Sequence, residues 1–112
     1  MPMNFLLIKS LKTIFEHHKN DLKVAYPTGN TNALNLGQVA VEITLRLISI
    51  FEKDDNGARP VNGRHSDYYK DPHFEDLILF FEYFHGEDSH GLGASHQTGW
   101  TGLIAKLIED IA

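Results

Sequence analysis

The segment NLGQVAVEITLRLISIF, residues 35–51, carries the clearest structural signal in this chain. Asn35 stands directly before the first apolar residue of the segment, and Asn is among the residues that favour the N-cap of a helix. Apolar residues then recur at three- and four-residue steps over about four turns, at Leu36, Val39, Ala40, Ile43, Leu47, Ile50 and Phe51. The pattern predicts an amphipathic helix that ends near Asp54.

On the N-terminal side, residues 4–20 show the same period, which predicts a first helix from Asn4 to about Asn20. Turn-forming residues are concentrated at 26–32, and Pro27 prevents a helix from continuing through Tyr26. We therefore expect a loop between the two helices. Because the first helix begins with almost no residues before it, we also expect the chain to be part of a longer one.

On the C-terminal side, residues 54–70 have no sustained period and predict a long connection. Asp71 followed by Pro72 is typical of a helix start, because proline is tolerated in the first turn. The third helix is expected to run to about Phe84, and after Leu77 it is apolar on all sides except at Glu82. A last helix begins at Trp100, with one apolar face formed by Leu103, Ile104, Leu107, Ile108 and Ile111.

These four expected helices predict an all-α fold, with the helices paired as antiparallel hairpins. No alternating strand pattern and no internal repeat is visible in the 112 residues. A chain of this length corresponds to one small domain or to part of one.

Charge and composition exclude several classes of function. The chain has 10 Lys and Arg against 15 Asp and Glu, a formal charge of −5, which disfavours a nucleic-acid partner. It has no Cys, so disulfides, thiol nucleophiles and Cys-ligated metals are excluded. No apolar run fits a signal peptide or a membrane span. We expect no membrane association and a cytoplasmic location.

Glu82 is the first candidate for chemistry, because a carboxylate within an apolar and aromatic run is costly to bury without a partner. On a helix Glu82 would lie near Glu75, on the flank of the apolar stripe, where it could border a cavity. The alternative is a solvated or salt-bridged position, which is the commoner role of an acidic residue on a helix flank.

The loop 86–99 is the second candidate, because it is rich in glycine and lies among several histidines and acids. His85, His90 and His96 with Asp88 suggest a metal site, but their intervals match no established ligand spacing. The sequence therefore predicts no metal and no cofactor. Metal binding by this loop stays open as a minor alternative to a plain surface loop, and a zinc titration would decide between them.

His96, Gln97 and Trp100 form a third cluster, in which polar groups precede an aromatic face, an arrangement that suits a sugar. Trp100 begins a segment with apolar residues at helical spacing. Packing in the core is therefore the first interpretation of Trp100, and stacking on a ligand is the second.

The segment DPHFEDLILFFEYFHGEDSHGLGASHQTGWTGLIAKLI, residues 71–108, resembles the C-terminal end of glycoside hydrolases of family 63, in particular the bacterial glucosidase-like branch. The matching motifs are Phe81–Phe84, Gly91–Gly93 and His96–Gly102, in the same order and spacing as in that branch. Shorter likenesses occur at Asn4–Ile8, Pro27–Gly29 and Arg59–Val61. Residues 62–70 have no firm match in the family, and no role is carried over to them.

The resemblance implies that residues 1–112 are the C-terminal portion of an (α/α)6 catalytic barrel that hydrolyses α-glycosidic bonds with inversion. It gives Glu82 the role of general base and places the general acid, an Asp, outside this chain. It makes a carbohydrate the ligand, with His96, Gln97 and Trp100 as substrate contacts. Because apolar burial disfavours an ionised carboxylate, the base assignment comes from the resemblance alone.

With half of the catalytic pair missing, we expect the isolated chain to be inactive and to associate with the rest of such a barrel. A different class of function is a small helical module without catalysis. Such a module would use its exposed apolar surface to bind a partner or a second copy of itself.

Overall fold

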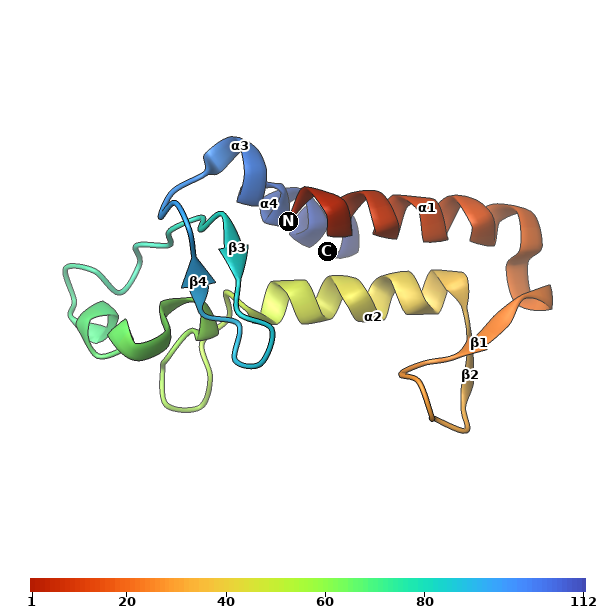
Figure 1. Cartoon of the computed structure of the whole chain (residues 1–112), viewed down its shortest axis with the longest axis horizontal. Helices are drawn as coiled ribbons and strands as arrows, with labels where there is room; N and C mark the ends of the chain where they lie inside the picture. The colour runs from red at the N-terminus through yellow and green to blue at the C-terminus, as the bar shows by residue number, and fades with distance from the viewer.

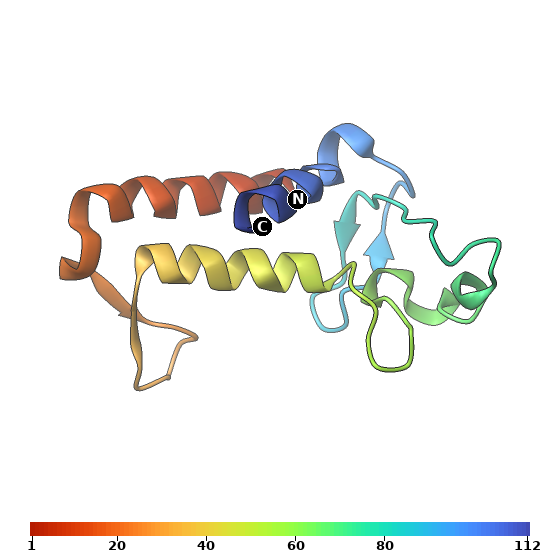
Figure 2. The same ribbon diagram turned by 180° about the vertical axis from the view of Figure 1, so that it is seen from behind.

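A computed structural model describes all residues of the chain, 1–112. Two long helices, α1 (Pro2–His18) and α2 (Leu36–Ser49), run antiparallel along one half of the molecule (Figure 1). A shorter helix, α4 (Leu103–Ile111), packs against both, and the two chain termini lie close together beside it (Figure 2). The molecule is elongated, with extents of 50 × 30 × 25 Å.

The predicted start of the second helix is confirmed. The Asn35 side chain accepts a hydrogen bond from the Gln38 amide at 2.9 Å, and the Asn35 amide donates to Gln38 Oε1 at 3.0 Å. This reciprocal arrangement satisfies two amides at the helix N-terminus. Local sequence therefore fixes where α2 begins.

The first predicted loop contains a small hairpin. After a 3-10 turn, η1 (Lys19–Asp21), strand β1 (Lys23–Ala25) pairs antiparallel with β2 (Ala33–Asn35), with Val24 opposite Leu34. The turn-rich residues 26–32 connect the two strands, as their composition favours.

The other half of the molecule consists mostly of turns and a second small sheet. Two 3-10 segments, η2 (Pro60–His65) and η3 (Tyr68–Lys70), are followed by β3 (Tyr83–Phe84) and β4 (Gly91–Leu92), which pair antiparallel. With two antiparallel sheets beside its helices, the chain is a mixed α and β structure. The predicted all-α fold of paired helical hairpins, and the (α/α)6 barrel portion that the resemblance implied, are therefore wrong.

The error arises at residues 71–84. A turn does begin at Asp71, whose carbonyl accepts the amides of Phe74 and Glu75, but the helix does not continue. From Phe80 onward the backbone is bonded to a distant segment instead, as in the 2.6 Å hydrogen bond from the Gln97 amide to the Phe80 carbonyl. A continuous apolar run is compatible with a buried strand as well as with a helix, so periodicity alone could not decide.

The last predicted helix is present but divided. It begins earlier than expected as the single turn α3 (Thr98–Thr101), and Gly102 separates this turn from α4. Leu107 and Ile104 on α4 are buried, as their spacing predicted.

A single hydrophobic core joins the helices to the loop-rich half. Its buried members are Met1, Ile8, Ala40, Ile48, Ile50, Phe51, Val61, Ile104 and Leu107. The Phe51 ring also meets the rings of Phe80 and Phe84, at centroid distances of 6.4 and 5.7 Å. Strand β3 and the residues before it are thereby held against the end of α2. None of the helices has the length and apolar character needed to cross a membrane.

Candidate functional site

Glu82 lies immediately before β3, and its side chain is exposed. Its Oε2 atom accepts a hydrogen bond from the Ala94 amide at 3.0 Å, while its own amide donates to the Ala94 carbonyl at 2.9 Å. The backbone of Glu82 is thus bonded to the same residue that orients its carboxylate. One carboxylate oxygen is fixed by the fold, and the side chain remains open to solvent.

Gly93 makes this arrangement possible. Its backbone has φ +73°, and a Cβ atom there would lie 2.6 Å from Tyr83 Cε1 and 2.7 Å from Glu82 Oε2. Only glycine combines a relaxed left-handed backbone with the absence of a side chain. The second glycine of the Gly-Leu-Gly motif is therefore required by the position of the Glu82 carboxylate.

The segment 96–101 is bonded to the segment that carries Glu82. His96 Nδ1 lies 3.3 Å from the Phe80 amide, which donates to it, and the two rings stack at a centroid distance of 5.5 Å. The hydroxyl of Thr101, which is fully buried, donates to the Phe81 carbonyl. These contacts bring the three predicted sugar contacts, His96, Gln97 and Trp100, into the same part of the molecule as Glu82.

Trp100 lies on the single turn α3 and is 46% exposed. The first interpretation of this residue, packing in the core, is therefore wrong. Its exposed indole ring is available to stack on a ligand, because aromatic faces pack against the apolar side of a sugar ring.

Glu75, the carboxylate that the predicted helix would have placed on the same flank as Glu82, makes a contact of its own. Its Oε2 atom lies 3.6 Å from Lys53 Nζ, in an exposed ion pair. Because residues 77–84 are not helical, Glu75 and Glu82 do not share a helix flank as predicted. Within this chain Glu75 is not placed to act as the second carboxylate of a pair.

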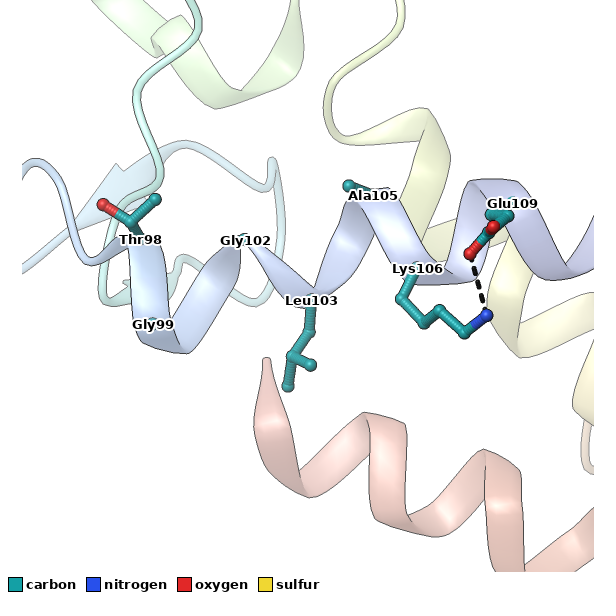
Figure 3. Close-up of a pocket in the computed structure, with 7 residues that line it drawn as sticks. All are labelled: Thr98, Gly99, Gly102, Leu103, Ala105, Lys106 and Glu109. Carbon is teal, nitrogen blue, oxygen red and sulfur yellow. Dashed lines mark hydrogen bonds and ion pairs between the residues drawn. The ribbon is translucent and has the colours of Figure 1, made fainter.

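Two hollows lie near the site, and Glu82 lines neither of them. A cavity of about 510 Å³ lies between η2 and the β3–β4 hairpin, lined by Phe81, Asp88, His90 and residues 61–65 and 91–92. An open groove of about 570 Å³ follows α3 and α4, where Lys106 Nζ is 2.8 Å from Glu109 Oε2 (Figure 3). Lys106 donates hydrogen bonds to the carboxylates of Glu109 and then Asp110, and these bonds raise the pKa of Lys106 above its ordinary value.

Sequence reasoning missed three groups that build this site. Thr101 fixes α3 to Phe81, Gly93 admits the carboxylate, and the Ala94 amide orients it. The doubled glycine of the Gly-Leu-Gly motif was a usable signal for a close backbone approach, but neither Thr101 nor Ala94 carries a signal that local sequence could reveal.

Comparison with known proteins gives one relevant match. The chain is 45% identical over 112 residues to a protein of Saccharomyces cerevisiae described as "Uncharacterized protein YMR196W", in an alignment that includes 98% of this chain. The chain spans 10% of the length of that relative. No protein-family model matches the chain, and no solved structure matches it.

Proposed function

We propose that this chain is part of an inverting α-glycosidase in which Glu82 is the general base. The observation that carries the proposal is the position of Glu82: its carboxylate is exposed, oriented by the Ala94 amide and located on a segment bonded to the residues around Trp100. The likeness of residues 71–108 to family 63 supports the same assignment.

In this mechanism Glu82 removes a proton from a water molecule as the water attacks the anomeric carbon. A second carboxyl group, about 6.5–9.5 Å away in inverting enzymes, protonates the leaving oxygen. The amide of Ala94 donates to Oε2 and fixes the carboxylate orientation. Trp100 and Gln97 would contact the sugar.

The acid is proposed to lie in a part of a longer enzyme that this chain does not include, which agrees with a relative ten times as long. We do not assign that role to Glu75, which is paired with Lys53. The chain alone should therefore bind a sugar weakly and hydrolyse nothing. We propose a cytoplasmic location for the enzyme.

Sugar binding can be followed through the fluorescence of Trp100, the single Trp of the chain. A cationic iminosugar, which mimics the charge of the glycosyl transition state, is the probe. We expect saturable quenching by the wild-type chain, at least tenfold weaker binding in Glu82→Gln, and no change in Glu87→Gln, which removes an exposed carboxylate from the adjacent loop. Equal binding by the wild type and Glu82→Gln would refute the role of Glu82.

A separate assay tests the location of the acid. The isolated wild-type chain is incubated with aryl α-glucosides and α-mannosides, and no release of the aryl group is expected. If the wild-type chain hydrolysed the substrate and Glu82→Gln did not, the result would support Glu82 as the general base. It would contradict the proposal that the general acid lies outside this chain.

A second candidate function is self-association through an exposed apolar face of α1. Met3, Leu6, Leu7 and Ile14 follow helical spacing and are exposed, Met3 by 75% and Leu6 by 58%. Apolar stripes of this kind are common at interfaces. A dimer in sedimentation equilibrium that dissociates in Leu6→Lys would support this function, and a monomer at high concentration would contradict it.

A further inference from the structure

The turn between β3 and β4 brings two histidines and an aspartate together. The His85 amide donates to the His90 carbonyl at 2.9 Å, and the Ser89 amide donates to the His85 carbonyl at 3.0 Å. These bonds close the turn, and the two imidazole rings stack at a centroid distance of 4.8 Å and an angle of 16°. Residues five positions apart in sequence thereby present parallel rings on one side of the hairpin.

Asp88 places its carboxylate beside both rings. Its Oδ1 atom lies 3.3 Å from His85 Nδ1 and 2.6 Å from His90 Nδ1, and it also accepts the His90 amide at 3.3 Å. One ligand atom from each of the three residues lies within 4.8 Å of the other two. The backbone of the turn therefore holds three side chains of metal-ligating type close together.

We propose that His85, Asp88 and His90 form a binding site for a divalent transition-metal ion of the zinc type. Two imidazole nitrogens and one carboxylate oxygen are a ligand set that Zn²⁺ accepts, with bonds of about 2.0–2.2 Å and a fourth position left for water or another ligand. Tetrahedral geometry with such bonds separates ligand atoms by about 3.4 Å. Small rotations of the three side chains, all partly exposed, bring them to that separation.

His90 is held in position by the residues that surround the site. Gly63 on η2 has φ +49°, and a Cβ atom there would lie 2.6 Å from His90 Cβ. η2 therefore packs directly against His90 and limits its movement. Asp88 and His90 also line the 510 Å³ cavity together with Arg64 and His65. A fourth ligand can reach the metal from that cavity, and an anionic one would meet the Arg64 side chain.

His96 does not belong to this group, because its ring lies on Phe80. The sequence suggested that His96 could join His85 and His90 as a ligand. In the structure the ligating residues are instead His85, Asp88 and His90, all within one turn. The site is independent of the glycosidase proposal and involves neither Glu82 nor Trp100.

The chain contains a matched control. Asp71 and His73 form the same Asp-x-His arrangement, with His73 Nδ1 2.9 Å from Asp71 Oδ1 and the His73 amide donating to that oxygen at 2.8 Å. Asp71 and His73 have no third ligating side chain beside them, unlike His85, Asp88 and His90. A pair of this kind alone should bind zinc weakly.

The test is calorimetric titration of the untagged chain with zinc chloride. We expect one saturable site per chain, with the dissociation constant raised at least tenfold in His85→Ala, Asp88→Asn and His90→Gln. His73→Gln and His96→Ala should bind within twofold of the wild type. Absence of a saturable site, or equal weakening by His73→Gln, would overturn the proposal.

A measurement on the wild-type chain covers the case in which a variant does not fold. Substoichiometric Co²⁺ should broaden the imidazole resonances of His85 and His90 first and produce the visible absorption of a tetrahedral ion. Selective broadening at His17 and His18, the adjacent pair at the end of α1, would overturn the proposal instead.

Discussion

Thr101→Val should weaken the connection between α3 and the segment that carries Glu82. The Thr101 side chain is completely buried, and its hydroxyl donates to the Phe81 carbonyl across twenty positions of sequence. Valine has nearly the same shape, so the substitution removes the hydrogen bond without opening a cavity. The hydrogen bond is part-buried, and a carbonyl that loses its donor away from water costs about 1–3 kcal/mol. We therefore expect the free energy of unfolding to fall by about 2 kcal/mol.

Thr44→Val is the matched control, because Thr44 is the other buried polar residue of the chain. Its hydroxyl donates to the Ala40 carbonyl one helical turn earlier, at 2.8 Å. That carbonyl also accepts a backbone amide of α2, as in any regular helix. Removing the hydroxyl should therefore cost less than about 1 kcal/mol.

The assay is urea denaturation followed by circular dichroism, with thermal unfolding as a second readout. For a domain of this size a loss of 2 kcal/mol lowers Tm by about 8 °C. The amide of Gln97, which donates to Phe80, should also exchange faster in Thr101→Val. If the two valine variants were equally stable, the long-range hydrogen bond would contribute nothing beyond a helical one, and the reasoning would be refuted.

Three further substitutions test other parts of the structure. Gly93→Ala should destabilise the fold by about 2–3 kcal/mol, from backbone strain and the clash with Glu82, whereas Gly86→Ala, with nothing near its Cβ position, should be neutral in the same denaturation assay. Leu107→Ala should cost about 2–5 kcal/mol, because the side chain is buried in the core. Lys106→Met should raise the pKa of Asp110 towards 3.8 in an NMR titration, because the Lys106 hydrogen bond lowers it. In the wild type the stabilisation from ionised Asp110 is present above pH 3.8 and is lost as the pH falls through the lower folded-state pKa.

The parts of the fold that depend on local sequence were predictable. The Asn35 cap is formed by residues three positions apart, and the apolar stripe of α2 needs only one partner face. The run from Leu77 to Phe84 is different, because its hydrogen-bonding partners at Ala94 and Gln97 are more than ten positions away. A run that is apolar at every position but Glu82 is compatible with a helix and with a strand, and tertiary contacts decided between them.

In the candidate site, too, the residue types follow from local sequence and their placement follows from distant contacts. The residue types at Glu82, His96 and Trp100 and their association with a sugar could be proposed from motifs, but their mutual placement depends on the hairpin. His85, Asp88 and His90 were named in the sequence as a minor metal-binding alternative together with His96, but their intervals match no established ligand spacing, and the sequence could not show that only these three lie together in one turn. Its geometry comes from the hydrogen bonds that close the β3–β4 connection.

Residues 77–84 are extended where a helix was predicted, and this difference changes the environment of Glu82. A helix would have surrounded its carboxylate with apolar side chains, an environment that favours the protonated form and therefore an acid. In the extended segment Phe80 and Phe84 face Phe51, whereas Glu82 is exposed and bonded to the Ala94 amide. The physical objection to a base at Glu82 thus came from the predicted helix, and the observed backbone removes it. The base assignment itself remains the proposal that the resemblance made.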